Sequence, residues 1–391
     1  MPSDALFDRD MTVGAGASIS ATIGVLVGRA EDASIPDRLF AEEDVGRRTG
    51  NVAYRLGKLA LFDAPQEHLL LVFDHELFGH GARVRERFDG PIGYHIHPPL
   101  PYGSGNASTS FVLDREPTPY ELLAISAGGM ESTGVVGAIV AERAFVERRM
   151  QPRDALRYLT FELDTLRYIA STDDQEEPGH DVGDFLETYN DLAASAAAPT
   201  LTPRRLRREA LVSLANPMAA YAAYGLARYL WNGADDVGVP ALSIAGVRYL
   251  PLMRYRLTPF GTEWALVNAL GGRVRPMEIE MRIGRSVQSR PWGFGVRQRD
   301  AARWRNWTVD AAVDVWQQPP VAESDPQQLA FDPRMGARVS ARVNRPVVPV
   351  WFSASRATLV VEVGAKSGGY VAGEPLRAGF VARAGIGFPL P

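Results

Sequence analysis

Six consecutive residues carry the clearest chemistry in this sequence: His75-Glu76-Leu77-Phe78-Gly79-His80. Imidazole and carboxylate side chains are ligands that proteins use for Zn²⁺, and a carboxylate beside the ion can accept a proton. The chain contains no cysteine, so thiolate sites and disulfides are excluded and a metal must be held by His and carboxylates. We expect His75 and His80 to ligate one zinc ion, with Glu76 as the general base for a zinc-bound water.

The spacing of the two histidines predicts a local distortion of their helix. They are five residues apart, which on a regular helix separates them by about 140°, too far to share one ion. One extra residue must therefore be accommodated as a π-bulge, for which Gly79 is well suited. The motif resembles H-E-x-x-G-H of the dipeptidyl-peptidase III family of zinc peptidases, over these six positions alone. That resemblance implies that His75 and His80 are zinc ligands and Glu76 is the general base.

A catalytic zinc site needs a third protein ligand. In gluzincin peptidases this ligand is a Glu from a later helix, and Glu131 is our first candidate. It is the only ionisable residue between Leu122 and Ala141, where an unpaired carboxylate would be costly. The adjacent Gly128-Gly129 would let its helix approach the motif closely. The alternatives are His95, His97, His180 and Asp181.

Two further groups of residues near the motif could contact a substrate. Residues on the following loop could stabilise an oxyanion. They are Tyr94, which we select as a catalytic residue, Tyr102 and His97. The segment after the motif alternates in charge, with Glu86 between the cationic residues Arg83, Arg85 and Arg87. This charge pattern indicates a solvated helix end, and the alternative is a clamp for an anionic substrate group.

The periodicity of apolar residues divides the chain into three regions. Residues 11–28 alternate with a period of two, which predicts a first strand. Residues 36–233 have helical patterns, with a kink or break expected at Asn216-Pro217. Residues 245–391 return to a period of two and predict about eight strands. The helical region would then be a large insertion after the first strand.

Each C-terminal strand has one apolar face and one face with charges of both signs. A soluble sandwich or barrel would turn the charges to water, whereas a transmembrane barrel would turn the apolar face to lipid. Strands of roughly ten residues with Trp near their ends favour the second architecture. The predicted fold class is α+β: an antiparallel, transmembrane β-barrel of about 8–10 strands with a helical insertion that carries the metal site. The N-terminal strand should pair with the last strand and close the barrel.

Charge and the N-terminal sequence bear on partners and location. A net charge of -4 over 391 residues gives no basic excess, so nucleic acid is not an expected partner. The expected partners are a peptide or protein substrate and membrane lipid, and the sequence does not indicate an oligomeric state. No signal peptide is visible, and we expect one to have been removed from a protein of the bacterial outer membrane.

The sequence therefore predicts a zinc-dependent metallohydrolase, specifically a membrane-associated metallopeptidase. Two alternatives remain open. One is an outer-membrane structural or transport barrel whose helical part binds metal without turnover. The other is a barrel enzyme that hydrolyses lipid or cell-wall esters or amides. A helical membrane protease ranks below these because of the β-rich C-terminal region.

Overall fold

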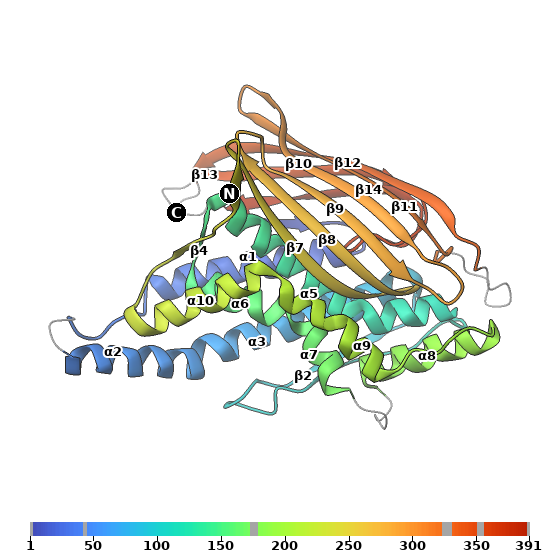
Figure 1. Ribbon diagram of the computed structural model, residues 1–391, viewed down its shortest axis with the longest axis horizontal. Helices are drawn as coiled ribbons and strands as arrows, with labels where there is room; N and C mark the ends of the chain where they lie inside the picture. The colour runs from blue at the N-terminus through green and yellow to red at the C-terminus, as the bar shows by residue number, and fades with distance from the viewer. Residues whose placement is uncertain (1–2, 42–44, 173–178, 323–330, 350–355, 389–391) are drawn as a thin grey trace.

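The computed structural model describes residues 3–41, 45–172, 179–322, 331–349 and 356–388. Ten antiparallel strands form one curved sheet, and a layer of helices packs against its concave side (Figure 1). The strand order is β1-β14-β13-β12-β11-β10-β9-β8-β7-β6. From β6 to β14 each strand is therefore hydrogen-bonded to its neighbour in sequence. The α+β class and the antiparallel sheet agree with the sequence prediction.

Most strands of the large sheet are nine residues or longer. They are β1 (Ser3–Phe7), β6 (Leu242–Ile244), β7 (Val247–Thr258), β8 (Gly261–Gly272), β9 (Met277–Arg285), β10 (Trp292–Trp304), β11 (Trp307–Gln318), β12 (Arg334–Pro349), β13 (Arg356–Lys366) and β14 (Gly379–Phe388). Two small pairs lie outside this sheet. They are β2 (Ile92–Ile96) with β3 (Ala107–Phe111), and β4 (Arg149–Met150) with β5 (Val237–Gly238).

The helices follow β1 and precede β5. They are α1 (Val13–Asp32), α2 (Val45–Lys58), α3 (Ala64–Phe73), α4 (Gly81–Arg87), α5 (Pro119–Glu147), α6 (Pro152–Glu162), α7 (Asp164–Ser171), α8 (Asp181–Ser195), α9 (Pro203–Ala210) and α10 (Pro217–Asn232). Two π-helical segments, η1 (Leu59–Asp63) and η2 (Asp74–His80), and the 3-10 segment η3 (Leu211–Ala215) connect some of them. The break predicted at Asn216-Pro217 is present, because Asn216 caps α10 and Pro217 begins it.

The prediction of a strand over residues 11–28 is wrong, because this segment forms most of α1. The side chain of Thr12 caps the helix by accepting a hydrogen bond from the backbone of Ala15. Small residues occupy both faces of the segment, so its alternation does not exclude a helix. Ala17, Ala21 and Val25, which are four residues apart, lie on one buried helical stripe. The first strand is instead β1, and it pairs with β14 as expected for the N-terminal strand.

The predicted barrel is not closed. Among the described strands β1 and β6 form the two edges of the sheet, and they do not pair with each other. The helices occupy the interior that a closed barrel would need. One hydrophobic core joins Val140 and Phe145 of α5 to Leu252 of β7 and Val267 of β8. The helical and β regions thus share a core.

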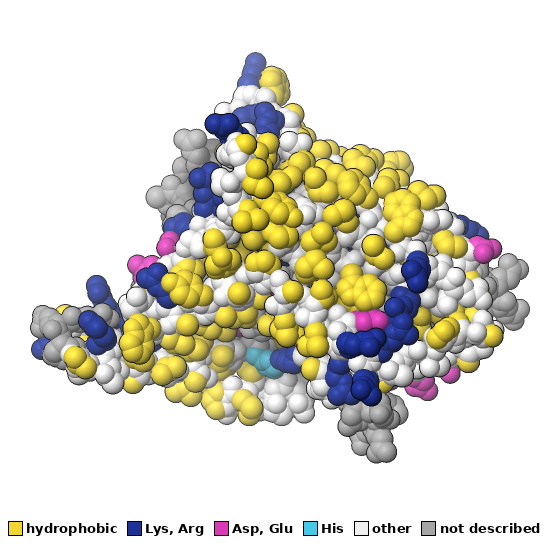
Figure 2. Space-filling model, viewed as in Figure 1, with side chains coloured by type: hydrophobic (Ala, Val, Ile, Leu, Met, Phe, Trp, Pro, Cys, Tyr) yellow, Lys and Arg dark blue, Asp and Glu magenta, His cyan; other side chains and the backbone are white. Residues whose placement is uncertain are grey.

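Two helices are long and apolar enough to cross a membrane by length and composition, namely α1 and α5. Most of each is buried inside the fold, as in a core helix of a soluble protein. The more unusual apolar surface lies on the sheet. Figure 2 shows hydrophobic side chains spread over the outer face of the strands, on the side away from the helices.

Candidate metal centre

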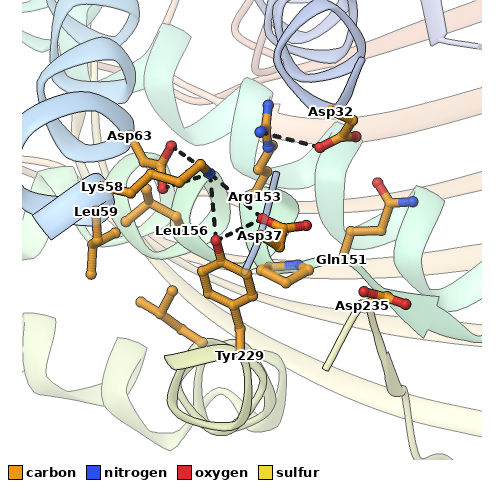
Figure 3. A pocket seen from close by; sticks show the side chains of 12 residues that line it. Asp32, Asp37, Lys58, Leu59, Asp63, Gln151, Arg153, Leu156, Tyr229 and Asp235 are labelled. Atoms are coloured by element: carbon orange, nitrogen blue, oxygen red, sulfur yellow. Dashed lines mark hydrogen bonds and ion pairs between the residues drawn. The ribbon is translucent and has the colours of Figure 1, made fainter. Parts of the chain in front are cut away.

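A first polar cluster in the helical layer surrounds a cavity of about 190 Å³ between α2, α6 and α10 (Figure 3). The ammonium group of Lys58 contacts the carboxylate of Asp63 at 3.2 Å and also pairs with Glu31. Arg153 pairs with Glu31 and, at 3.2 Å, with Asp32. Because these cations balance the neighbouring carboxylates, we interpret the cluster as a structural ion-pair network.

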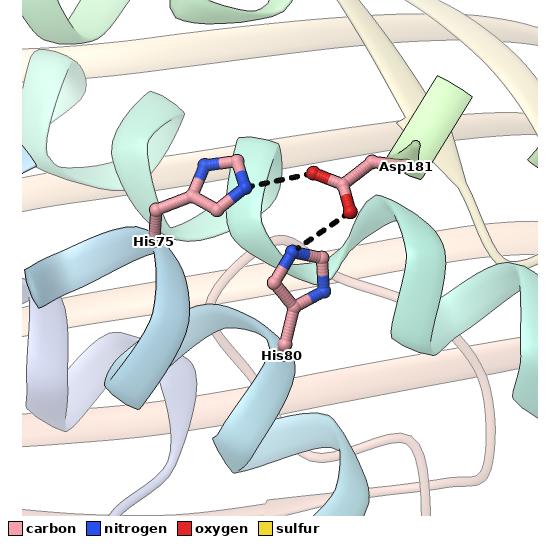
Figure 4. Close-up of side chains that lie close together, drawn as sticks. All are labelled: His75, His80 and Asp181. Atoms are coloured by element: carbon pink, nitrogen blue, oxygen red, sulfur yellow. Dashed lines mark hydrogen bonds and ion pairs between the residues drawn. The ribbon is translucent and has the colours of Figure 1, made fainter. Parts of the chain in front are cut away.

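The second cluster is built on the motif. Its segment forms the π-helix η2, which confirms the predicted extra residue. A π-helix closes on the fifth residue rather than the fourth, so the side chains of His75 and His80 return to one face. Their ring centroids lie 4.8 Å apart. Both rings point toward the carboxylate of Asp181, at the start of α8 (Figure 4).

The three side chains are spaced as ligands of one ion. Nε2 of His75 lies 2.9 Å from Oδ2 of Asp181, and Nε2 of His80 lies 3.2 Å from Oδ1. Two ligand atoms in a tetrahedral zinc site, each about 2.0 Å from the ion, are about 3.3 Å apart. His75, His80 and Asp181 form the one group in the described part of the chain whose ligand atoms converge in this way. They could hold a metal ion.

The other ring nitrogen of each histidine is anchored to an acceptor. Nδ1 of His80 is 2.7 Å from the carbonyl oxygen of Ile125. A carbonyl only accepts, so this nitrogen carries the proton and leaves the Nε2 lone pair free for a metal. Nδ1 of His75 is 3.2 Å from Oδ2 of Asp164, which also accepts from Thr133 at 3.0 Å. Both imidazoles are thus oriented with Nε2 toward Asp181.

Glycines allow η2 and α5 to pack backbone against backbone. A β-carbon at position 79 would lie 2.4 Å from the α-carbon of Gly129. The close approach predicted from Gly128-Gly129 is therefore present, and it brings the Ile125 carbonyl within reach of His80. Gly79 serves this contact as well as the π-helix.

The electrostatic field of the site favours positive charge. Burial alone would lower the pKa of both histidines, but nearby groups raise them. For His75 these are Tyr168, Asp164 and Asp181, and for His80 the main group is Asp181. Burial would raise the pKa of Asp181, whereas the two histidines lower it. The arrangement suits either protons or a cation between these three side chains.

The site opens onto a cleft of about 720 Å³. Glu76 and His80 lie on its wall, with Tyr168, which stacks on His75 at a centroid distance of 5.0 Å. The carboxylate of Glu76 accepts a hydrogen bond of 2.6 Å from the hydroxyl of Thr109. The residue predicted as the general base is therefore buried, oriented and adjacent in sequence to His75, a member of the candidate metal group.

Glu131, the first choice for the third ligand, is placed elsewhere. Nε and NH2 of Arg83 hold its two carboxylate oxygens at 2.9 and 2.5 Å, and the backbone N–H of Gly373 donates to it at 2.8 Å. An isolated carboxylate in an apolar helix did need a partner, but the partner is an arginine. Asp181, one of the open alternatives, lies with the histidines instead.

None of the other predicted residues belongs to the converging group of His75, His80 and Asp181, although His180 lines the same cleft. The hydroxyl of Tyr94 accepts a hydrogen bond of 2.7 Å from Arg85, and Tyr94 is not among the described residues that line the cleft. His95 and His97 are exposed on the β2–β3 hairpin, which occupies part of the loop expected after the motif. His180 caps α8 through the backbone of Gly183.

The arginines after the motif are not a solvated helix end, so that interpretation is wrong. Arg83 and Arg87 are buried, and Arg87 pairs with Glu121 at 2.6 Å. Sequence reasoning also missed Asp164 and Tyr168, which orient and cover His75. Their spacing of four residues on one helix was the available signal, because it places both on one face.

No protein-family model, no curated protein and no solved structure matches this chain. Its function must therefore be inferred from the geometry of the site.

Proposed function

We propose that this chain is a zinc-dependent metallopeptidase, with His75, His80 and Asp181 as zinc ligands and Glu76 as general base. The observation that carries the proposal is the orientation of the two imidazoles. Each has Nδ1 fixed by an acceptor and Nε2 directed at the same carboxylate. Three protein ligands of this kind are the pattern of catalytic zinc sites, which keep a fourth position open.

Bound zinc would polarise a carbonyl group and lower the pKa of a water molecule. The protein's own part falls to Glu76, which follows a ligand directly and faces the cleft. Its carboxylate accepts the proton of the attacking water and transfers it to the leaving amine. Thr109 fixes the orientation of this carboxylate through Oε2, which leaves Oε1 for proton transfer.

The neighbouring strand supports a peptide as the substrate. Among the described strands β3 pairs with β2 alone. Four residues of β3 line the cleft, namely Ala107, Ser108, Thr109 and Phe111. An extended peptide can add to such an edge through main-chain hydrogen bonds. It would then lie beside Glu76, because Thr109 is bonded to that side chain.

The first test measures zinc and activity in the same preparations. Wild-type protein should contain about one zinc per chain and cleave members of a peptide library, with products identified by mass spectrometry. Glu76→Gln should keep its zinc and lose 10²- to 10⁴-fold in kcat. Glu116→Gln, at an exposed position that does not line the cleft, is the matched control and should retain zinc and turnover.

The competing functions predict other outcomes. A metal-binding structural or transport protein would hold zinc but cleave no peptide, with no difference between Glu76→Gln and wild type. An enzyme for lipid or cell-wall esters or amides would be inert on peptides and active on detergent-dispersed lipid or cell-wall fragments. Chelator-free wild-type protein without bound metal would contradict both the metal site and the peptidase.

A further inference from the structure

The two faces of the large sheet have opposite chemistry, with the charges inside. On β9 Arg282 is buried while Met281 and Ile283 are 44% and 62% exposed. On β12 Arg338 is buried while Val339 is 57% exposed. The alternation continues across the strands. The exposed apolar positions include Ile283, Phe294, Val313, Val339, Val363 and Ile386, one on each strand from β9 to β14.

The concave face is stabilised by ion pairs between strands and the segment before β14. Arg338 contacts Asp314 at 3.1 Å and Glu374 at 2.7 Å. Arg383 contacts the same Glu374 at 3.0 Å. These groups are nearly inaccessible to solvent. The register of the sheet is therefore fixed by buried charge, and the apolar residues must face outward.

The outward face is one continuous apolar surface. Val313 pairs in register with Val339 on one side and with Val296 on the other, and Val363 pairs with Ala341 and Ala382. An antiparallel sheet exposed to water on one face normally carries its polar residues there. Monomeric soluble proteins rarely expose contiguous apolar patches larger than about 300–600 Å². Six adjacent strands with the reverse polarity make this face a candidate interaction surface.

Aromatic and cationic side chains mark the two ends of these strands. At one end, Trp304 and Trp307 stand at the β10–β11 turn, each with an arginine about 4.9 Å from the ring centroid. At the other end, Arg285 of β9 contacts Glu209 of α9. This short helix exposes Arg204, Arg207 and Arg208. Figure 2 shows the cationic groups beside the apolar area, in the region where Figure 1 places α9.

We propose that the convex face of β9–β14 contacts the acyl region of a lipid bilayer, with the arginines at the strand ends bound to anionic headgroups. Trp and Arg at such boundaries are typical of interfacial anchors. This inference is independent of the proposed peptidase activity.

A second copy of the chain fits this surface less well. The sheet curves over the helices, so that its exposed face is convex (Figure 1), and two convex faces bury little area against each other. Such a dimer would also bring the two exposed arginine groups of α9 toward like charges. A bilayer can follow the curvature, and anionic lipid complements the charge.

The absence of cysteine makes a direct test simple. Val339→Cys and Val313→Cys would each be labelled with bimane and mixed with vesicles of phosphatidylcholine and phosphatidylglycerol containing a doxyl-labelled lipid. The matched control is Val112→Cys, because Val112 is 62% exposed but lies beyond β3, outside the large sheet. We expect quenching by the doxyl lipid to be at least threefold stronger at positions 339 and 313 than at 112. Circular dichroism checks that the variants are folded.

Equal quenching at the three positions, or no vesicle binding, would overturn the proposal. A bimane at position 339 that is shielded without lipid, together with disulfide-linked dimers of unlabelled Val339→Cys, would assign the face to a second copy. In a second measurement, Arg204→Gln/Arg207→Gln/Arg208→Gln should weaken binding to anionic vesicles by about fivefold per arginine, and less at high salt. Unchanged affinity would exclude α9 as the headgroup contact.

Discussion

Gly129 lies against the imidazole of His75, so closely that a β-carbon at position 129 would stand 2.2 Å from Nε2 of that ring. A ligating nitrogen of the proposed zinc site therefore occupies space that only a glycine leaves open. The same contact holds α5 next to η2, and through it the Ile125 carbonyl next to His80. The geometry of the proposed zinc site thus depends on a residue that contributes no ligand.

Gly129→Ala should reduce zinc affinity by at least tenfold, because the new methyl group displaces the His75 ring. The measurement is competition with a chromogenic chelator. Gly134→Ala is the matched control on the same helix, where a β-carbon meets nothing within 4 Å. Alanine in a helix interior should leave affinity unchanged there and stabilise the fold by about 0.5–1 kcal/mol. Equal zinc affinities for the two variants would show that the His75 ring can move without weakening zinc binding.

Asp181→Asn and Glu131→Gln separate the third ligand that we propose from the structure, Asp181, from the one predicted from sequence, Glu131. Asp181→Asn should lose most of its zinc, because a neutral amide replaces the only carboxylate of the triad. Glu131→Gln should retain the stoichiometry but lose on the order of 3 kcal/mol of unfolding free energy, because Arg83 remains buried with a weaker partner. Elemental analysis and denaturant titration report these two properties. Zinc lost from Glu131→Gln and kept in Asp181→Asn would reverse the assignment.

The sequence was informative where local chemistry determines the outcome. The five-residue spacing required a π-helix, and η2 is one. The eight strands predicted after residue 245 are present as β7 to β14. Among the regular backbone conformations, only an extended strand places alternate residues on opposite faces. Gly128-Gly129 correctly indicated a close helix contact.

The sequence was misleading where contacts between residues distant in sequence determine the structure. Asp181 is separated from His80 by about 100 positions, and nothing local distinguishes its carboxylate from that of Glu131, which Arg83 neutralises. The small residues over 11–28 are compatible with the apolar pattern of a helix and with that of a strand, and packing beneath the sheet favours the helix. Closure of the sheet likewise depends on how much helix fills its interior.

Asp164→Asn should weaken zinc binding by about 10- to 100-fold, because its carboxylate fixes the tautomer and orientation of His75. Asparagine keeps the volume and can still accept from Thr133, so the fold should be retained. A chelator titration gives the affinity, and circular dichroism confirms folding. Asp184→Asn, on the cleft wall but not bonded to either histidine, is the control. An unaltered affinity in Asp164→Asn would mean that Nδ1 of His75 needs no anchor.

If the peptidase proposal holds, the cleft should prefer basic peptides. Asp184, Glu187 and Asp191 lie on one face of α8 and line the cleft. Glu187→Lys should lower kcat/KM by about tenfold for peptides with Lys or Arg near the scissile bond, and much less for the same peptides with norleucine. The salt dependence of kcat/KM should decrease in the variant. An equal effect on both peptide sets would indicate a structural rather than an electrostatic role.

Glu121 should contribute stability that depends on pH. Burial alone would raise its pKa, but hydrogen bonds from Arg115, the Thr118 backbone and Arg87 lower the pKa to about 2. Because the folded pKa lies below the usual value near 4.5, the stabilisation is complete above pH 4.5 and is lost as the pH falls through 2. A shift of this size corresponds to about 3 kcal/mol at pH 7, of which less than half remains at pH 3.

Glu121→Gln should therefore unfold at lower denaturant than wild type at pH 7, by about 2–3 kcal/mol, and this difference should shrink steadily between pH 5 and pH 3. Glu116→Gln is the control, because Glu116 is exposed and close by in sequence. Since Glu121 also completes the capping box of α5, the helix that supplies the Ile125 carbonyl, zinc affinity should fall together with stability. A stability difference that stays constant from pH 7 to pH 3 would mean that Glu121 contributes through packing and neutral hydrogen bonds, and that its charge does not contribute to the free energy of unfolding.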